Sequence, residues 1–168
     1  TIGGGVSKLA REKNPNNYFK TYSTRQGLNY FNVNAIFEDR EKNIWIGTDL
    51  GLNQYRGERI QVFDEADSIP NNIIWSTYCD KEGNIWTGTN NGLAKMSFSY
   101  GANDTESHSV KLYGAKNGLT SNVILSVFQD SKNNIWVGSG FGGAFMLAPG
   151  SDKFIQYNSA KGLSNDMV

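Results

Sequence analysis

Short runs of alternating apolar and polar residues recur along the chain, each bounded by glycine, asparagine or aspartate. β-branched and aromatic residues dominate the runs, which favours strands over helices. No stretch keeps an apolar period of 3.6 residues, so we expect almost no helix. The predicted strands are 33–38, 43–47, 52–55 and 60–63, then 74–79, 84–88, 93–96 and 110–113, then 124–129, 134–138, 144–147 and 154–157.

One motif opens the second predicted strand of each set. Its copies are D-R-E-K-N-I-W-I-G-T from Asp39, D-K-E-G-N-I-W-T-G-T from Asp80 and D-S-K-N-N-I-W-V-G-S from Asp130. Trp45 and Trp86 are 41 residues apart, a period that fits one four-stranded propeller blade. Trp136 follows Trp86 by 50 residues, and we assign the difference to a lengthened polar loop at 97–109.

The repeats predict an all-β chain built from antiparallel propeller blades. The predicted parts are the outer half of a blade at 1–23, full blades at 33–64, 74–114 and 124–158, and the start of another blade at 159–168. A propeller closes with about 4–8 blades, so this segment alone would form an open arc. Because an open arc exposes two apolar blade faces, we expect the chain to belong to a longer propeller protein or to self-associate.

Turn chemistry accounts for most of the repeated residues. The aspartate that opens each motif is expected to accept backbone N–H groups. The position before N-I-W needs a positive φ, which Gly83 and Asn133 adopt easily and Lys42 only at a cost. The glycine two residues after each tryptophan is expected to let the next blade approach closely. We therefore interpret these residues as framework.

Composition excludes several function classes. Lys+Arg and Asp+Glu both number 16, so no basic excess points to a nucleic-acid partner. No apolar run reaches about 18 residues, and we expect no membrane contact by this segment. Cys79 is the one cysteine, which rules out an internal disulfide, and we expect it to pack as a small apolar residue.

Catalysis within this segment is not expected. His108 is the one histidine, and the polar loop at 97–109 would leave it solvated. Asp104 and Glu106 lie nearby, but a metal site would need further histidine, cysteine or clustered carboxylate ligands. We therefore predict no catalytic residue, no metal and no cofactor.

Taken together, the pattern G-L, N-x-V/I, E/Q-D-x-x-x-N-I-W-x-G-T and G-L resembles the two-component regulator propeller repeat over nearly the whole chain. That resemblance implies a seven-bladed propeller in the periplasmic sensor region of a Bacteroidetes hybrid two-component system. It also implies a membrane helix and a histidine kinase further along the protein, and an oligosaccharide as ligand.

Residues that break the repeat are better candidates for function, because the fold does not explain them. The connections between fourth and first strands and between second and third strands gather at one face of a propeller. The candidate ligand-binding residues in or next to those connections are the aromatic Tyr30, Phe31, Trp75 and Phe141 and the polar Asp49, Asn90 and Asn91. Flat rings beside short polar groups suit a sugar. Packing between blades is the alternative role for the aromatic residues, and turn chemistry for the polar ones.

The leading hypothesis is a piece of a ligand-sensing propeller that binds an oligosaccharide in the periplasm and regulates a downstream kinase. The first alternative is a protein-interaction or dimerisation scaffold without a small ligand. The second is an accessory propeller of a polysaccharide-degrading enzyme. The fold alone does not distinguish these three functions, so the distinction depends on the residues of the site.

Overall fold

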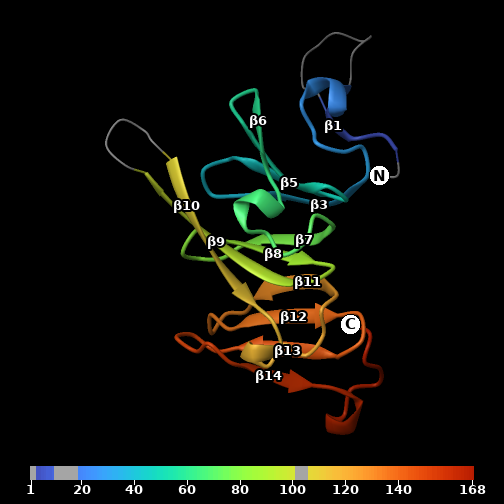
Figure 1. Cartoon of the computed structure of the whole chain (residues 1–168), viewed down its shortest axis with the longest axis vertical. Helices are drawn as coiled ribbons and strands as arrows, with labels where there is room; N and C mark the ends of the chain where they lie inside the picture. The colour runs from blue at the N-terminus through green and yellow to red at the C-terminus, as the bar shows by residue number, and fades with distance from the viewer. Residues whose placement is uncertain (1–2, 10–18, 101–105) are drawn as a thin grey trace.

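The computed structural model describes residues 3–9, 19–100 and 106–168, and these form one two-stranded and three four-stranded antiparallel sheets. The sheets stack along the long axis of the molecule without closing into a ring (Figure 1). Within each four-stranded sheet, neighbouring strands are also consecutive in sequence. The chain is therefore an open arc of propeller blades, which confirms the predicted fold class.

The blades follow one another in sequence order. The half-blade contains β1 (Val6–Leu9) and β2 (Phe19–Tyr22). The first blade contains β3 (Val33–Glu38), β4 (Ile44–Thr48), β5 (Gly51–Arg56) and β6 (Arg59–Phe63). The second contains β7 (Ile74–Cys79), β8 (Ile85–Thr89), β9 (Gly92–Tyr100) and β10 (Glu106–Tyr113). The third contains β11 (Ile124–Gln129), β12 (Ile135–Ser139), β13 (Ala144–Leu147) and β14 (Phe154–Tyr157).

A single 3₁₀ turn follows each outer strand. These turns are η1 (Thr24–Gln26), η2 (Glu65–Asp67), η3 (Ala115–Asn117) and η4 (Ser159–Lys161). In the part of the chain that the structure describes, no helix is long and apolar enough to span a membrane. The predicted strands of the three blades agree with the structure to within one residue, apart from the outer pair of the second blade.

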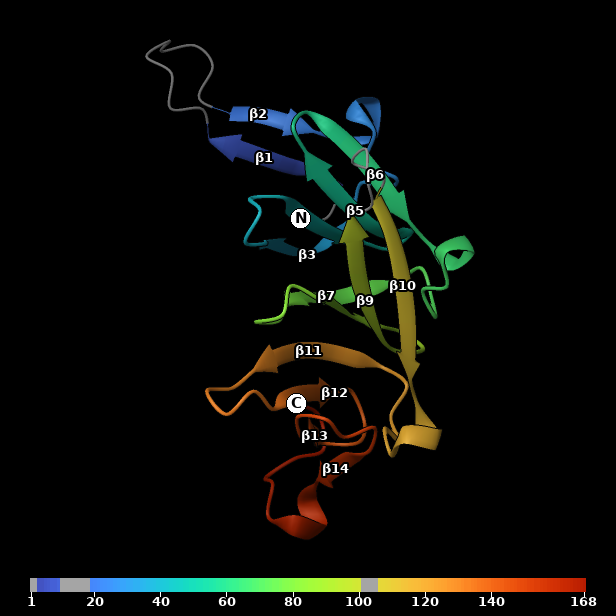
Figure 2. The ribbon, with the colours of Figure 1, turned by 90° about the vertical axis from the view of Figure 1, so that its left-hand side faces the viewer.

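The outer pair of the second blade corrects the sequence prediction of a loop at 97–109. β9 runs to Tyr100 and β10 starts at Glu106, and Phe98 is paired with His108. Figures 1 and 2 show this hairpin extending beyond its own sheet toward the first blade. Ser97, Phe98 and Ser99 alternate between polar and apolar residues in β9, but in β10 His108 stands where an apolar residue would have revealed the same period.

His108 is therefore a strand residue and not part of a solvated loop. Its ring packs edge-on against Phe63 of the first blade at a centroid distance of 5.3 Å. Its Nε2 lies 3.9 Å from Oδ1 of Asp67 in the turn η2. The hairpin thus ties the second blade to the first at their outer edges.

Each repeated aspartate organises the turn between its first two strands. Asp39 accepts the backbone N–H of Asn43 at 2.8 Å and the indole N–H of Trp45 at 2.7 Å. The same indole bond joins Asp80 to Trp86 and Asp130 to Trp136. The positions before N-I-W have φ values of 70° in Lys42, 85° in Gly83 and 65° in Asn133, as the turn chemistry predicted.

The core lies between the sheets. Trp45 packs against Phe63 and Trp86 against Tyr113, with ring centroids 5.8 and 5.5 Å apart. A Cβ on Gly47 would lie 2.6 Å from Cγ2 of Ile74 in the next blade, which confirms the expected close approach. Core clusters fill the spaces between successive sheets.

Both ends of the arc expose apolar side chains. Phe128 and Ile155 of the third blade are 57% and 49% exposed, and Leu9 and Phe19 of the half-blade are 59% and 62% exposed.

Cys79 is buried, and that burial raises the pKa of its thiol to about 11. The thiol is thus protonated at neutral pH and acts as a small core residue, as the sequence predicted.

Candidate functional site

A bulge in the first strand of every blade aims one side chain at the face where the connections gather. The pairing of first and second strands shifts between Val33 and Ala35, between Ile74 and Ser76, and between Ile124 and Ser126. The extra residues are Asn34, Trp75 and Leu125. Bulges redirect side chains and are frequent beside functional sites. The flanking residues repeat from blade to blade, whereas the bulged residues differ.

The bulged residues meet the connections between second and third strands. Asn34 Nδ2 donates to Asp49 Oδ1 at 2.8 Å, and Trp75 Nε1 lies 3.5 Å from Asn90 Oδ1 in the equivalent position of the next blade. The second carboxylate oxygen of Asp49 accepts from Asn32 Nδ2 at 2.8 Å. We call this region, with the connections that lead into each first strand, the loop face.

Three of the four aromatic candidates on the loop face are exposed. Phe31 is 41% exposed, Trp75 37% and Phe141 76%. Tyr30 is half-buried and stacks on Phe31 with ring centroids 4.1 Å apart. Four aromatic side chains thus lie at or near the surface where the sequence placed them.

The polar candidates are held by hydrogen bonds to the first strand, to the connection before it, or to their own turn. Both carboxylate oxygens of Asp49 accept amide N–H groups, so it is a scaffold for Asn32 and Asn34. Asn91 is exposed, with its backbone N–H bonded to Thr89 and its amide 3.4 Å from the carbonyl of Pro70. Asn90 is exposed beside Trp75. Turn chemistry therefore applies to Asn91, whereas Asp49 holds the connection before β3 and the bulged Asn34.

The structure brings Tyr30 to Phe31 and Trp75 to Asn90. Among the described residues, no ring contact or hydrogen bond joins Phe141 to another candidate. Sequence reasoning missed Asn34 and Leu125, which share the position of Trp75 in their blades. Alignment of the three repeats would have shown one variable position between two repeating ones, although a bulge there is not visible in a sequence.

Blade architecture and the repeated Asp–Trp turn define the chain as part of a β-propeller. The family model of the two component regulator propeller matches residues 26–49, 68–91 and 118–141. Three segments of the chain, one for each four-stranded blade, thus match the repeat of the two component regulator propeller family. No curated protein matches the chain.

Solved structures share the fold. The extracellular domain of BT3049 from B. thetaiotaomicron, assigned to a hybrid two component system, is 21% identical with a TM-score of 0.74; the match covers 91% of this chain and 20% of that one. The extracellular domain of BT4673 from the same organism, also assigned to a hybrid two component system, is 23% identical with a TM-score of 0.67, over 96% of this chain and 22% of that one. This chain therefore spans about a fifth of the length of these structures.

Proposed function

We propose that the chain is part of the periplasmic sensor propeller of a hybrid two-component signalling protein, and that its loop face binds an oligosaccharide and thereby regulates a downstream kinase. Two findings support the class of protein. The repeats match the model of a regulator propeller family. Two structures of the same fold are extracellular domains of proteins assigned to hybrid two component systems.

The exposed tryptophan at the bulge of the second blade is the observation that carries the ligand class. Trp75 presents a flat ring at the loop face and has the amide of Asn90 beside it. The C–H faces of a sugar pack on such rings, and its hydroxyls bond to amides at the ring edge. Phe31 and Phe141, from connections of other blades, would add surfaces for further sugar units.

A ligand that touches connections of several blades can shift a conformational equilibrium. It does so only if it binds one arrangement of the blades better than another. The loop face suits this role because Asn34 of the first blade also donates to the backbone carbonyl of Ile74 in the second, at 3.0 Å. Sugar binding there would act on contacts that set the relation between the blades.

Titration of glycans into the full-length protein tests the proposal. We expect saturable binding, and a loss of roughly 5- to 30-fold in affinity for Trp75→Ala, since a buried aromatic contact contributes on the order of 1–2 kcal/mol. Tyr30→Ala and Phe141→Ala should also weaken binding. Leu112→Ala, which removes a side chain that is 50% exposed on the outer strand β10, should leave it unchanged. Unchanged affinity in all three aromatic variants would refute the site, and no binding of any glycan would refute the ligand class.

A protein-interaction scaffold is the second candidate, because apolar side chains on the loop face are exposed. Leu50 is 47% exposed and Phe141 76%. Light scattering of the full-length protein separates the two functions. A scaffold loses its assembly on Phe141→Ala without any glycan effect, whereas a sensor loses glycan affinity with its assembly intact.

A further inference from the structure

A cavity of about 300 Å³ lies between the second and third blades. Its walls come from the hairpin turns Asp80–Glu82 and Asn133, from β9 and β10, and from the turn after β13. These turns are at the opposite ends of the strands from the loop face, so the cavity is separate from the site proposed above. A ligand in this cavity would be independent of the function proposed for the loop face.

The equivalent space between the first and second blades is smaller, about 110 Å³. There β9 continues past Met96, and the ring of Phe98 lies 5.4 Å from that of Trp45. In the third blade β13 ends at Leu147, and the chain turns through Ala148, Pro149 and Gly150. Proline has no N–H to continue the ladder, so no side chain equivalent to Phe98 enters the space.

A lysine without an ion pair faces this cavity. Lys95 is half-buried, and its ammonium lies 5.4 Å from the centroid of the Trp86 ring. Among the described residues no carboxylate lies within ion-pair distance of it. Gln54 and Met146 occupy the same register position opposite the tryptophans of the first and third blades. The fold therefore does not require a cation at this position.

Three of the other charged residues around the cavity, Lys111, Asp152 and Asp80, are already engaged. Lys111 forms an ion pair with Asp152, and the hydrogen bond between them raises the pKa of the lysine. Asp80 uses both carboxylate oxygens for Asn84, Glu82 and Trp86 within its own turn. Among the described residues this leaves two charged side chains of the lining without an ion pair, the ammonium of Lys95 and the exposed carboxylate of Glu82 on the rim.

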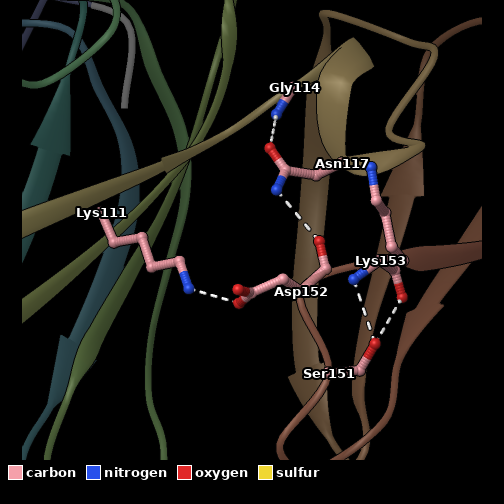
Figure 3. A network of polar contacts seen from close by, with 6 residues as sticks. All are labelled: Lys111, Gly114, Asn117, Ser151, Asp152 and Lys153. Atoms are coloured by element: carbon pink, nitrogen blue, oxygen red, sulfur yellow. Dashed lines mark hydrogen bonds and ion pairs between the residues drawn. The ribbon is translucent and has the colours of Figure 1, made fainter.

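Contacts between the two blades hold the rim in place. Figure 3 shows Lys111 reaching Asp152, and Asn117 of η3 donating to the backbone carbonyl of Asp152 at 3.0 Å. On the other side Lys81 N donates to Gln129 Oε1 at 2.8 Å. The cavity is thus preformed, which lowers the cost of ordering on binding.

We propose that this cavity binds a small organic anion of the size of one sugar ring, whose carboxylate pairs with Lys95. The amide N–H₂ of Gln129 and the carboxylate of Glu82 would bond to hydroxyls of the ligand, and Leu147 and Pro149 would contact its carbon frame. The volume is at the lower end of the roughly 300–1,000 Å³ of small-molecule sites, which favours a monosaccharide acid over an oligosaccharide. A half-buried ammonium without a partner favours an anion over a neutral sugar.

Calorimetric titration of the full-length protein with glucuronate and with glucose tests this site. The two probes share the ring, but only glucuronate carries the carboxylate. We expect saturable binding of glucuronate and binding of glucose at least tenfold weaker. Lys95→Met, which introduces the residue that the third blade has at this position, should weaken glucuronate binding by roughly 10- to 100-fold, because bonds to charged groups contribute about 1.5–3 kcal/mol. Lys95→Arg should retain most of the affinity.

Lys20→Met is the matched control. It removes an ammonium that lies 5.3 Å from the ring of Tyr22 in the half-blade, outside the cavity, and should leave binding unchanged. Equal binding of the two probes, absence of glucuronate binding, or full affinity in Lys95→Met would each overturn the proposal. Loss of glycan binding in Trp75→Ala does not bear on it, so the two sites fail independently.

Discussion

The two interfaces between full blades share the same framework and differ in what fills their outer part. In both, a tryptophan packs on the last aromatic residue of the outer strand, and an isoleucine lies over a glycine. At the first interface the long hairpin of β9 and β10 adds Phe98 and His108 to the core. At the second, a short turn leaves a cavity of about 300 Å³.

The difference shows how a repeat acquires a site without losing its fold. The inner strands and the Asp–Trp turn are under the same steric demands in every blade, and they repeat. The outer strands carry less of the packing, so their length and side chains can vary. The longer β9 carries Phe98 into the space at the first interface, whereas β13 ends at Leu147 and leaves the space at the second interface open.

Removal of the shared tryptophan should have the largest effect. Trp45 is 1% exposed, and Trp45→Ala removes its packing on Phe63 and leaves Asp39 without the indole donor. We expect a loss of about 3–5 kcal/mol in the free energy of unfolding, measured by urea denaturation. Trp75→Ala is the control, because that tryptophan is exposed, and it should cost less than about 1 kcal/mol. Equal losses would contradict the assignment of Trp45 as framework and Trp75 as site.

Overpacking of the second interface should come next. A Cβ on Gly88 would lie 2.8 Å from the backbone oxygen of Ile124, where the neighbouring blade cannot yield easily. Gly88→Ala should therefore lower the free energy of unfolding by about 1–3 kcal/mol. Gly114→Ala is the matched control, since its Cβ would meet no atom within 4 Å and its φ is −158°. A neutral Gly88→Ala would mean that the blades are not packed as closely as described.

Truncation of Phe98 should open a space at the first interface, so that it resembles the second interface. Phe98 is half-buried against Trp45 and Phe63. Phe98→Ala should cost roughly 1–3 kcal/mol and enlarge the space of about 110 Å³ beside it. Ser99→Ala, on the exposed face of the same strand, should cost well under about 1 kcal/mol. A crystal structure of Phe98→Ala with this space unchanged would show that the side chain of Phe98 is not what fills it.

The sequence predicted the framework well because each blade contains the same tight hairpin between its first two strands. Asp130, Asn133 and Trp136 can be placed from their spacing, since a tight hairpin needs a positive φ and an acceptor for its N–H groups. Phe98 and His108 could not be placed, because they pack against residues of another blade and because the polar His108 hides the apolar face of its strand. Local pattern does not report such long-range contacts.

Only part of the loop face could be predicted, because some of its contacts follow from the topology and others depend on long-range structure. Topology places the connections together, so Trp75 and Asn90 could be expected to meet at one face. The partners of Asp49 could not, because Asn34 reaches it only through a bulge. The cavity beside Lys95 had no sequence signal, since it results from what the turn after β13 leaves empty.

The smallest expected effect is on the pH dependence of stability, and it comes from the turn of the third blade, which differs from the turns of the first two. Asp130 is half-buried, whereas Asp39 and Asp80 are buried. Hydrogen bonds from Asn134 and then Trp136 lower the pKa of Asp130 to about 2, against about 3.9 in an unfolded chain. Since the folded pKa is the lower one, the carboxylate contributes stability that is fully present above about pH 4 and is lost as the pH falls toward about 2. Asp130→Asn should therefore make the melting temperature less dependent on pH between about 4 and 2. Asp152→Asn, at the exposed rim, is the control that tests whether removal of any carboxylate reduces this pH dependence. An unchanged slope in Asp130→Asn would show that this turn does not hold its carboxylate in the charged form.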